Sequence, residues 1–312
     1  MNTLHFKYAV EVERTGSITQ AADNLFMAQP NLSKAIKELE DTLGITIFER
    51  SSKGVVPTPK GVQFLCYAKN ILGQIDKMEA LYIPEDARRQ CFSISIPRGT
   101  YIVTGFTEFV KALDPHREID VNVQETNSMQ TISNITDGQF NLGIIRYQTV
   151  HESYFAGYLA EKGLSSETVW EYESLVLMSK NHPLAEVPTL QYDALGEYVE
   201  IIHGDTMIPY LSVKEIYRPN ETAHAKRRVI VYERCSQFEI LSTVPVTYMW
   251  VSPIPEGMLG RYELVQRKCK GAKFQFKDVL VYPKDYKFTE LDRLFIEKMQ
   301  NQRHAVSSRE YR

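Results

Sequence analysis

The sequence predicts an α/β protein made of an N-terminal winged helix-turn-helix, a long linker helix and a larger α/β domain. Three observations carry this prediction. Residues 17–43 contain two short helical patterns separated by a turn-length gap, and residues 58–82 contain one long apolar stripe at helical spacing. From residue 91 onwards, strand-like and helix-like patterns alternate. At 312 residues, the chain is long enough for two or three compact units.

The composition is that of an ordinary globular protein, with 43% hydrophobic and 24% charged residues and a formal net charge of -3. This charge does not favour nucleic-acid binding, so such binding would depend on local basic side chains. The N-terminus interleaves charged and apolar residues, and no apolar run approaches a membrane-spanning length. We therefore expect a cytoplasmic protein with no membrane partner.

Two short helices are predicted within residues 17–43. Ser17 and Gln20 have the spacing of a capping box at the start of the first helix. Pro30 suits the first turn of the second helix, where its missing N–H is not needed, and Gly44 ends that helix. The second helix carries an inward stripe at helical spacing: Leu32, Ile36, Leu39 and Leu43.

The opposite face of the second helix presents side chains that can bond base edges or phosphates. Gln and Asn match adenine edges, Ser bonds several bases, and Lys reaches guanine or phosphate. The candidate DNA-binding residues on this helix are Gln29, Pro30, Asn31, Ser33, Lys34 and Lys37. On spacing alone, an ordinary helical hairpin with a solvated polar face is an equally good interpretation.

A helix over residues 4–14 should complete the core of this small domain. Residues 45–48 and 55–58 then read as two short strands joined by a turn, which is the pattern of a wing. Arg50 and Lys53 in the wing are expected to lie against phosphates or in a minor groove, although Lys53 also fits a solvated loop charge. Thr58 is included in the DNA-binding set and, with Pro59, also opens the next helix as its cap.

The predicted linker helix runs to about residue 82 and is roughly 35–40 Å long at 1.5 Å per residue. This length exceeds what the small winged domain can cover, so we expect the helix to pair with a copy of itself. A dimer would present two recognition helices to a partly symmetric DNA site. The expected seam is Val62, Leu65, Ala68, Leu72, Ile75, Met78 and Tyr82.

The rest of the chain begins with a βαβαβ pattern, which indicates parallel strands. Strands are expected at 92–96, 119–123 and 141–145, and helices at 101–113 and 129–137. Residues 170–178, 198–202 and 228–232 resemble strands of a further sheet, followed by a helix at 236–242. A returning strand at 274–282, a closing helix at 290–299 and a frayed polar tail at 301–312 complete the prediction.

The N-terminal region resembles the LysR-type transcriptional regulators without a gap from about residue 4 to about residue 61. The residues that carry this resemblance are Gly16, Ser17, Ala21, Ala22, Leu25, Gln29, Pro30, Leu32, Ser33, Ile36, Leu39, Glu40, Leu43, Gly44, Phe48, Arg50, Thr58 and Gly61.

The resemblance implies a DNA-binding domain at 1–58, a linker and hinge at 59–88, and an effector domain at 89–300 similar to periplasmic binding proteins. Lobe one is expected at 91–162 plus 269–300, and lobe two at 163–268. Where the family usually has a Gly-rich turn near the end of lobe two, this chain has Val244, Pro245 and Val246. The resemblance also implies a homodimer that assembles into a tetramer.

A ligand is expected beyond the carboxyl ends of the strands, where helix N-termini favour anions. Arg98 and Arg146 could bind a carboxylate or phosphate, and a small anion is the preferred effector class. Pairing of either arginine with a local acid such as Glu125 remains an alternative. The candidate effector-binding residues are Pro97, Arg98, Gly99, Thr100, Tyr101, Asn127, Ser128, Arg146 and His203.

No catalytic elbow, phosphate loop or paired metal-ligand motif is present, so neither an enzyme nor a cofactor or metal site is predicted. An exported solute-binding protein would need a signal peptide. The predicted function is sequence-specific transcription regulation controlled by a small effector. Control by cysteine oxidation or by a partner protein stays open, because the chain has four scattered cysteines at Cys66, Cys91, Cys235 and Cys269.

Overall fold

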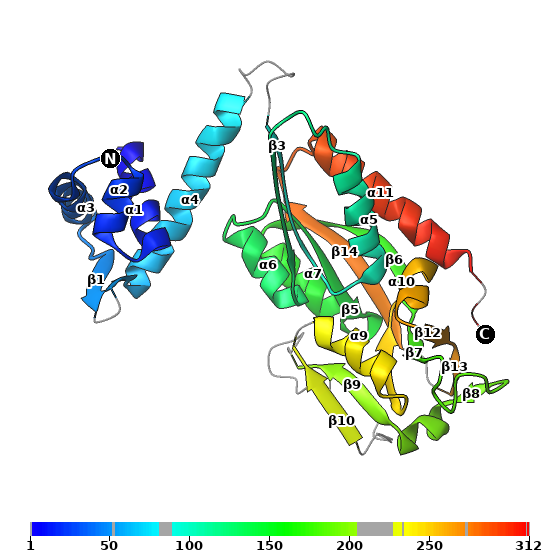
Figure 1. The fold of residues 1–312 in the computed structure, drawn as a ribbon. Helices are drawn as coiled ribbons and strands as arrows, with labels where there is room; N and C mark the ends of the chain where they lie inside the picture. Colours follow the sequence, from blue (N-terminus) through cyan, green and yellow to red (C-terminus); the bar gives the residue numbers. More distant parts are fainter. Residues whose placement is uncertain are drawn as a thin grey trace. The chain divides into compact units, whose positions relative to one another are not determined.

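The computed structural model describes residues 2–51, 54–80, 89–204, 227–232, 234–271, 274–309 and 311. The chain forms two compact units that divide near residue 88 (Figure 1). The predicted wing residue Lys53, the seam residue Tyr82 and the hinge at 83–88 lie outside the described residues. Within the described part of the chain, no helix combines the length and apolarity needed to cross a membrane.

The first unit is a winged helix-turn-helix followed by one long helix, as the sequence predicts. Its elements are α1 (Thr3–Thr15), α2 (Ile18–Asn24), α3 (Gln29–Leu43), β1 (Phe48–Ser51), β2 (Gly54–Pro57) and α4 (Pro59–Ala80). β1 and β2 pair antiparallel as the wing. The strand expected at 45–48 starts only at Phe48, because Ile45 and the following residues cross from the end of α3 to the wing.

Local signals in the sequence explain the helix boundaries. The Ser17 hydroxyl accepts a hydrogen bond from the Gln20 amide at 3.3 Å and so caps α2. The predicted capping box is one-sided, since the Gln20 side chain donates to Asn24 instead of returning to Ser17. Gly44 ends α3 with a φ of 66°, a conformation that glycine adopts without strain.

The predicted seam of α4 divides between two roles. Leu65 and Ala68 are buried in the core of the first unit, together with Phe6, Val12 and Leu32. They are therefore not available to a second copy, which corrects the seam as predicted. The large apolar side chains that α4 leaves exposed are Val62, Tyr67, Ile71 and Met78.

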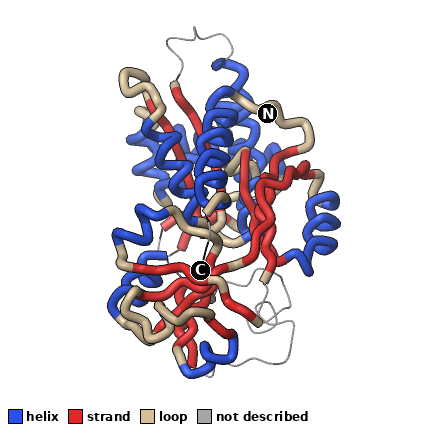
Figure 2. Tube along the Cα trace, turned by 90° about the vertical axis from the view of Figure 1, so that its right-hand side faces the viewer, coloured by secondary structure: helices blue, strands red, loops and turns tan. Residues whose placement is uncertain are grey.

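The second unit contains two five-stranded sheets, which can be followed in Figure 2. The first sheet has the order β4-β3-β5-β14-β6, formed by β3 (Gln90–Ile96), β4 (Ile119–Glu125), β5 (Leu142–Gln148), β6 (Leu164–Glu173) and β14 (Gln275–Pro283). β3 is parallel to β4 and β5, whereas β14 is antiparallel to its neighbours.

Helices cover both faces of the central strands of the first sheet. α5 (Thr100–Lys111) and α11 (Glu290–Ser307) pack side by side on one face, against Phe92 and Ile94 (Figure 1). α6 (Ser128–Thr136) and α7 (Glu152–Glu161) cover the other face, against Ile145 and Val279. A short 3₁₀ turn, η2 (Thr149–His151), precedes α7. This double coverage explains the nearly continuous apolar runs of the central strands.

The second sheet has the order β10-β9-β11-β7-β12. Its strands are β7 (Leu175–Ser179), β9 (Val199–His203), β10 (Arg227–Val231), β11 (Thr247–Val251) and β12 (Leu264–Arg267), accompanied by α9 (Arg234–Thr243), α10 (Glu256–Arg261) and η3 (Tyr192–Glu197). A small parallel pair joins β8 (Leu190–Gln191) to β13 (Cys269–Lys270). In the turn that lacks the expected glycines, the Thr247 amide donates to the Val244 carbonyl at 3.1 Å.

The chain passes from the first sheet to the second, and back again, at residues later in the sequence than the predicted lobe boundaries. The whole of β6 pairs with β14 in the first sheet, so lobe one extends to Glu173 and not to 162. Residues 170–178 are thus two strands in different sheets. On the return, Cys269 still pairs in lobe two. Residues 170–178 form one run in the sequence, and nothing within that run indicates that the chain leaves one sheet and enters the other.

The C-terminal helix is longer than predicted. α11 begins at the capping box of Thr289 and Asp292 and continues to Ser307. Val306 is only 1% exposed and belongs to the core of the first sheet. The segment expected to be a frayed tail is therefore helical through Ser307, because one apolar residue two turns beyond Met299 anchors it.

One histidine gives the second unit a predicted pH dependence. His182 is 3% exposed, and burial lowers its pKa from 6.5 to about 4. Between pH 6.5 and 4 the unfolded chain binds more protons than the folded one, so stability falls as the pH falls through this window. We expect urea unfolding to show about 1–2 kcal/mol less stability at pH 5 than at pH 7.5 from this group. The His182→Asn variant should lack this loss of stability between pH 7.5 and pH 5. If its pH profile equals that of the wild type, the assignment to His182 is contradicted.

Candidate nucleic-acid interface and ligand cleft

The recognition face of α3, meaning Gln29, Pro30, Asn31, Ser33, Lys34 and Lys37, lies opposite the buried side of the helix. Leu32, Ala35, Ile36 and Leu39 form that buried side, and the remaining positions are exposed or half-buried. Lys34 is paired with Glu38 at 3.8 Å on the surface, a contact that is worth little and leaves the ammonium available. The helix therefore carries amide, hydroxyl and ammonium groups at exposed or half-buried positions on this face.

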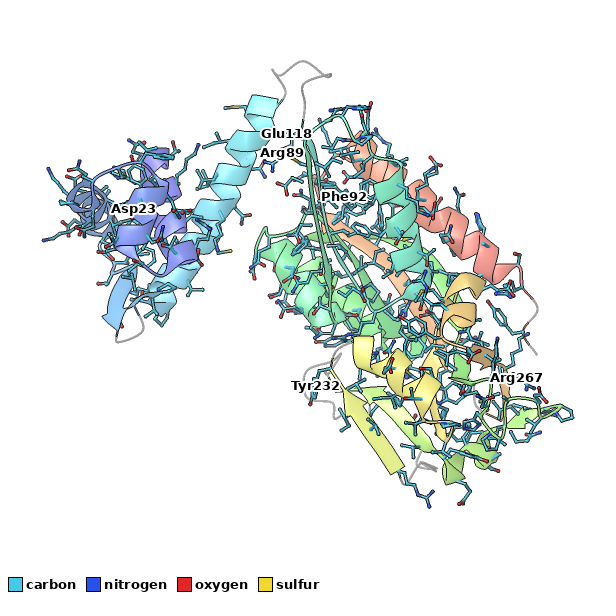
Figure 3. The ribbon with its side chains drawn as sticks, viewed as in Figure 1. Asp23, Arg89, Phe92, Glu118, Tyr232 and Arg267 are labelled. Atoms are coloured by element: carbon cyan, nitrogen blue, oxygen red, sulfur yellow. The ribbon has the colours of Figure 1, made fainter. Side chains whose placement is uncertain are left out.

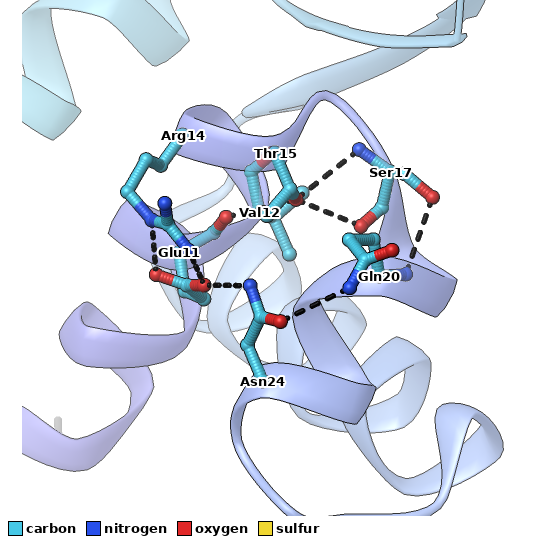
Figure 4. Close-up of polar contacts among 7 residues, drawn as sticks. All are labelled: Glu11, Val12, Arg14, Thr15, Ser17, Gln20 and Asn24. Carbon is cyan, nitrogen blue, oxygen red and sulfur yellow. Dashed lines mark hydrogen bonds and ion pairs between the residues drawn. The ribbon is translucent and has the colours of Figure 1, made fainter.

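A carboxylate on α1 holds α2 in place behind this face (Figure 4). Glu11 accepts hydrogen bonds from Arg14 at 2.8 and 2.5 Å and from Asn24 at 2.7 Å. The bonds from Arg14, and then that from Asn24, lower the pKa of Glu11 to about 2. The carboxylate thus stays charged and ties the two helices together.

Thr58 does not belong to the DNA-binding surface. Its side chain is buried, donates to the Thr46 carbonyl at 2.6 Å and accepts from the Gly61 amide at 2.9 Å. Because Thr58 caps α4, its hydroxyl makes both hydrogen bonds within the protein. This corrects the inclusion of Thr58 in the predicted DNA-binding set. Arg50 lies on β1 of the wing.

In the second unit, a cleft opens between the two sheets, with an empty volume of about 800 Å³ that includes open solvent. Seven of the nine predicted effector residues line it: Pro97, Arg98, Thr100, Asn127, Ser128, Arg146 and His203. The carboxyl ends of β3, β4 and β9 bring most of these residues together. The two others, Gly99 and Tyr101, do not line the cleft.

Arg146 forms a buried ion pair at the base of the cleft. Its Nε and Nη2 donate to Asp278 Oδ1 and Oδ2, both at 2.7 Å. Burial opposes the charge of Arg146, but the Asp278 carboxylate outweighs this effect and raises the guanidinium pKa. Tyr101 Oη also donates to Asp278, at 2.6 Å, and burial raises the Tyr101 pKa well above 10. Arg146 is thus paired with an acid, but the acid is Asp278, 132 residues away in the sequence, and not a local one such as Glu125.

Other predicted side chains are also engaged within the protein. Ser128 Oγ donates to the Arg146 carbonyl at 2.6 Å, and Asn127 Oδ1 accepts from the Gln130 amide at 2.9 Å. Arg98 Nη2 donates to the carbonyl of Tyr232 at 2.9 Å. Tyr232, labelled in Figure 3, follows β10 in the second sheet. Arg98 therefore bridges the two sides of the cleft. Gly99 serves packing, since a Cβ there would lie 2.8 Å from Arg146 Nη2.

Buried polar atoms of the cleft wall lack a hydrogen-bond partner among the described residues. Ser174 Oγ and Gln237 Oε1 are two such atoms, and both residues line the cleft. Tyr172 lies in the same wall, and burial raises its pKa well above 10, so its phenol stays protonated. Unsatisfied buried polar atoms are costly. A ligand or water with matching donors and acceptors would satisfy them.

Most of the wall that the second sheet supplies was not predicted from the sequence, and neither were Thr126, Tyr172 and Phe276 from the side of the first sheet. The missed residues are Thr126, Tyr172, Ser174, Gln237, Phe238, Met249, Trp250, Val251, Ser252, Ile254 and Phe276. Ser252 and Gln237 follow the ends of β11 and β10, so the rule applied to the first sheet would have found them. Tyr172 and Ser174 lie at the change of sheet, for which the sequence shows no signal.

Comparison with known proteins accounts for both units. Residues 4–62 match the family described as "Bacterial regulatory helix-turn-helix protein, lysR family", and residues 111–303 match the "LysR substrate binding domain". The chain is 26% identical over 198 residues to a putative transcriptional regulator, PtxE, of Stutzerimonas stutzeri, covering 62% of this chain and 92% of that protein. It is 43% identical over 81 residues to the regulator BenM of Acinetobacter baylyi, covering 26% and 27% of the two chains.

Solved structures share the fold at low sequence identity. A full-length OxyR variant from Pseudomonas aeruginosa matches 96% of this chain and 98% of its own, with a TM-score of 0.63 and 16% identity. Full-length CbnR in complex with its target DNA matches 97% of this chain and 100% of its own, with a TM-score of 0.63 and 15% identity. With both domain families matched in order, the chain belongs to the LysR family of DNA-binding transcriptional regulators, which are not enzymes.

Proposed function

We propose that this regulator binds a partly symmetric DNA site in the cytoplasm and responds to a small anionic effector in the cleft of its second unit. The observation that carries this proposal is the pair of buried, unsatisfied polar atoms of Ser174 and Gln237 in the cleft wall. These atoms lie beside apolar walls from Phe238, Trp250 and other residues. Such a combination is typical of a small-molecule site.

The charges around the cleft favour a small carboxylate over a multiply charged ligand. Asp278 neutralises Arg146, and Arg98 is a second arginine that lines the cleft. Thr100 and Ser128 open α5 and α6, whose N-terminal amides favour a negative group. One anionic head with an apolar or aromatic body fits these surroundings.

A thermal-shift screen of the full chain against small carboxylates, phosphates and aromatic acids tests the effector. An acid present at about 100 times its dissociation constant should add about 2.7 kcal/mol to the stability of the second unit. The shift should shrink strongly in Arg98→Ala, which removes a guanidinium from the cleft wall, and persist in Arg117→Ala, a half-buried arginine that does not line the cleft. A screen without any stabilising acid would count against an anionic effector.

We propose that the recognition face of α3 distinguishes base sequences and that the wing binds the phosphate backbone of the DNA. Ser33→Ala should reduce discrimination between a duplex selected from a random pool and its single-base variants, by about 1–3 kcal/mol at one position. Lys53→Ala should weaken binding evenly across sequences and reduce the salt slope by about 1. Anisotropy titrations over several salt concentrations separate these outcomes. Equal effects of both variants on all duplexes would refute the assignment.

We propose dimerisation through α4, with further assembly into a tetramer. The apolar side chains that α4 exposes, Val62, Tyr67, Ile71 and Met78, support a contact with a second copy. A change from Ile71 to Glu should shift the full chain to a smaller species in analytical ultracentrifugation. Retention of the wild-type assembly in this variant would rule out α4 as the contact.

Control by thiol oxidation is the second candidate. Cys91 is exposed, whereas burial raises the pKa of Cys269 to about 12, so that thiol is protonated and unreactive at neutral pH. The side chain of Cys235 lies outside the described residues. Thiol titration of the ligand-free protein distinguishes this case. A rapidly reacting cysteine whose oxidation alters DNA binding, combined with no stabilising acid, would favour redox control.

A further inference from the structure

We infer that Glu40, on the inner edge of the recognition helix, is a positioning residue that sets where the wing meets DNA. Its Oε1 accepts hydrogen bonds from the amides of Ile47 at 2.6 Å and Phe48 at 3.0 Å. Phe48 is the first residue of β1, so one carboxylate joins α3 directly to the base of the wing. This inference rests on the proposed contact of the wing with DNA.

The surrounding contacts show that Glu40 completes a rigid base for the wing. The Val55 amide on β2 donates to the Gly16 carbonyl at 2.8 Å, and the Thr58 amide donates to the Ile47 carbonyl at 2.9 Å. The first bond ties the wing to the residue that ends α1, and the second closes the base of the wing just before α4. Glu40 supplies the side-chain connection from the recognition helix itself to the start of β1.

The chemistry of the contact explains why a carboxylate suits this position. After α3 ends at Gly44, the chain turns back and presents two successive amides that need an acceptor. A charged oxygen forms stronger hydrogen bonds to amides than a neutral one. A negative charge so close to a phosphate-binding surface weakens DNA attraction, so it must act through position and not through attraction to DNA.

Three variants of Glu40 distinguish the effect of side-chain length from the effect of side-chain charge. Glu40→Gln keeps an oxygen at the same distance, Glu40→Asp keeps the charge but is one methylene shorter, and Glu40→Ala removes both. If Glu40 positions the wing, Glu40→Gln should keep the wild-type salt slope even where the lost negative charge changes the affinity, whereas Glu40→Asp and Glu40→Ala should lower the salt slope by about 1, as expected for one lost phosphate contact. The change of Asp41 to Ala is the matched control, since this exposed neighbour loses the same charge.

The experiment measures the affinity of the full chain for a selected duplex at several salt concentrations, together with hydroxyl-radical protection of the flanking backbone. Glu40→Asp and Glu40→Ala should lose the flanking protection and leave the preference among single-base variants unchanged. Circular dichroism at the assay temperature confirms that each variant is folded. Lys53→Ala tests the wing contact itself: if it leaves slope and protection unchanged, the proposed wing contact fails. If it changes them and Glu40→Asp does not, the role of Glu40 is overturned.

Discussion

Replacing Asp278 with alanine is expected to lower the free energy of unfolding of the second unit by about 3–5 kcal/mol. Asp278 is fully buried and is the bidentate partner of Arg146, whose side chain is 14% exposed. Without the carboxylate, a buried guanidinium and the Tyr101 hydroxyl both lose their partner. Chemical denaturation of the full chain, followed through the tryptophans Trp170 and Trp250, measures the loss.

Two further variants test the cause of this loss. The exposed Asp285 carries the same charge, so Asp285→Ala should change stability by less than about 0.5 kcal/mol. Replacing both partners, with Arg146→Met and Asp278→Leu together, should recover much of the stability, because no buried charge remains. If Asp278→Ala is as stable as the wild type, the buried ion pair does not hold the base of the cleft.

Adding one methyl group at Gly61 should destabilise the DNA-binding unit by about 3 kcal/mol or more and abolish DNA binding. An alanine Cβ at this position would lie 2.0 Å from the Ile47 carbonyl oxygen, a backbone atom that cannot rotate away. The same carbonyl accepts the hydrogen bond from the Thr58 amide. Thermal unfolding of the first unit and anisotropy with a selected duplex measure both effects.

Gly73 provides the matched control in the same helix. A Cβ at Gly73 meets nothing within 4 Å, so Gly73→Ala should stabilise α4 by up to about 1 kcal/mol through lower chain entropy in the unfolded state. Opposite signs for the two variants are the expected result. A neutral Gly61→Ala would show that the wing does not need its close approach to α4.

The sequence predicted local structure well wherever one face of an element is buried. Leu32, Ile36 and Leu39 identified α3, and the run from Phe92 to Ile96 identified β3, because side-chain periodicity follows directly from backbone geometry. Gly44 and Pro30 marked the ends of α3 through their backbone constraints. The carboxyl-end rule also placed Arg98 and His203 in the cleft.

What the sequence could not predict depends on pairing between distant segments. Arg146 and Asp278 are 132 residues apart, and nothing in the local pattern of β14 distinguishes a structural carboxylate from a surface one. The change of sheet after Glu173 depends on which strand β6 pairs with, and not on its own residues. The burial of Leu65 likewise depends on how α4 packs against the helices that precede it.

Control of DNA binding by the cleft is tested most directly by the effect of effector and DNA on each other's binding. An acid found by thermal shift should change the dissociation constant for a selected duplex, and the duplex should change the dissociation constant for the acid by the same factor. Arg98→Ala should weaken binding of the acid and leave DNA binding in its absence unchanged. If the acid binds the cleft but neither constant responds to the other ligand, the cleft does not control DNA binding.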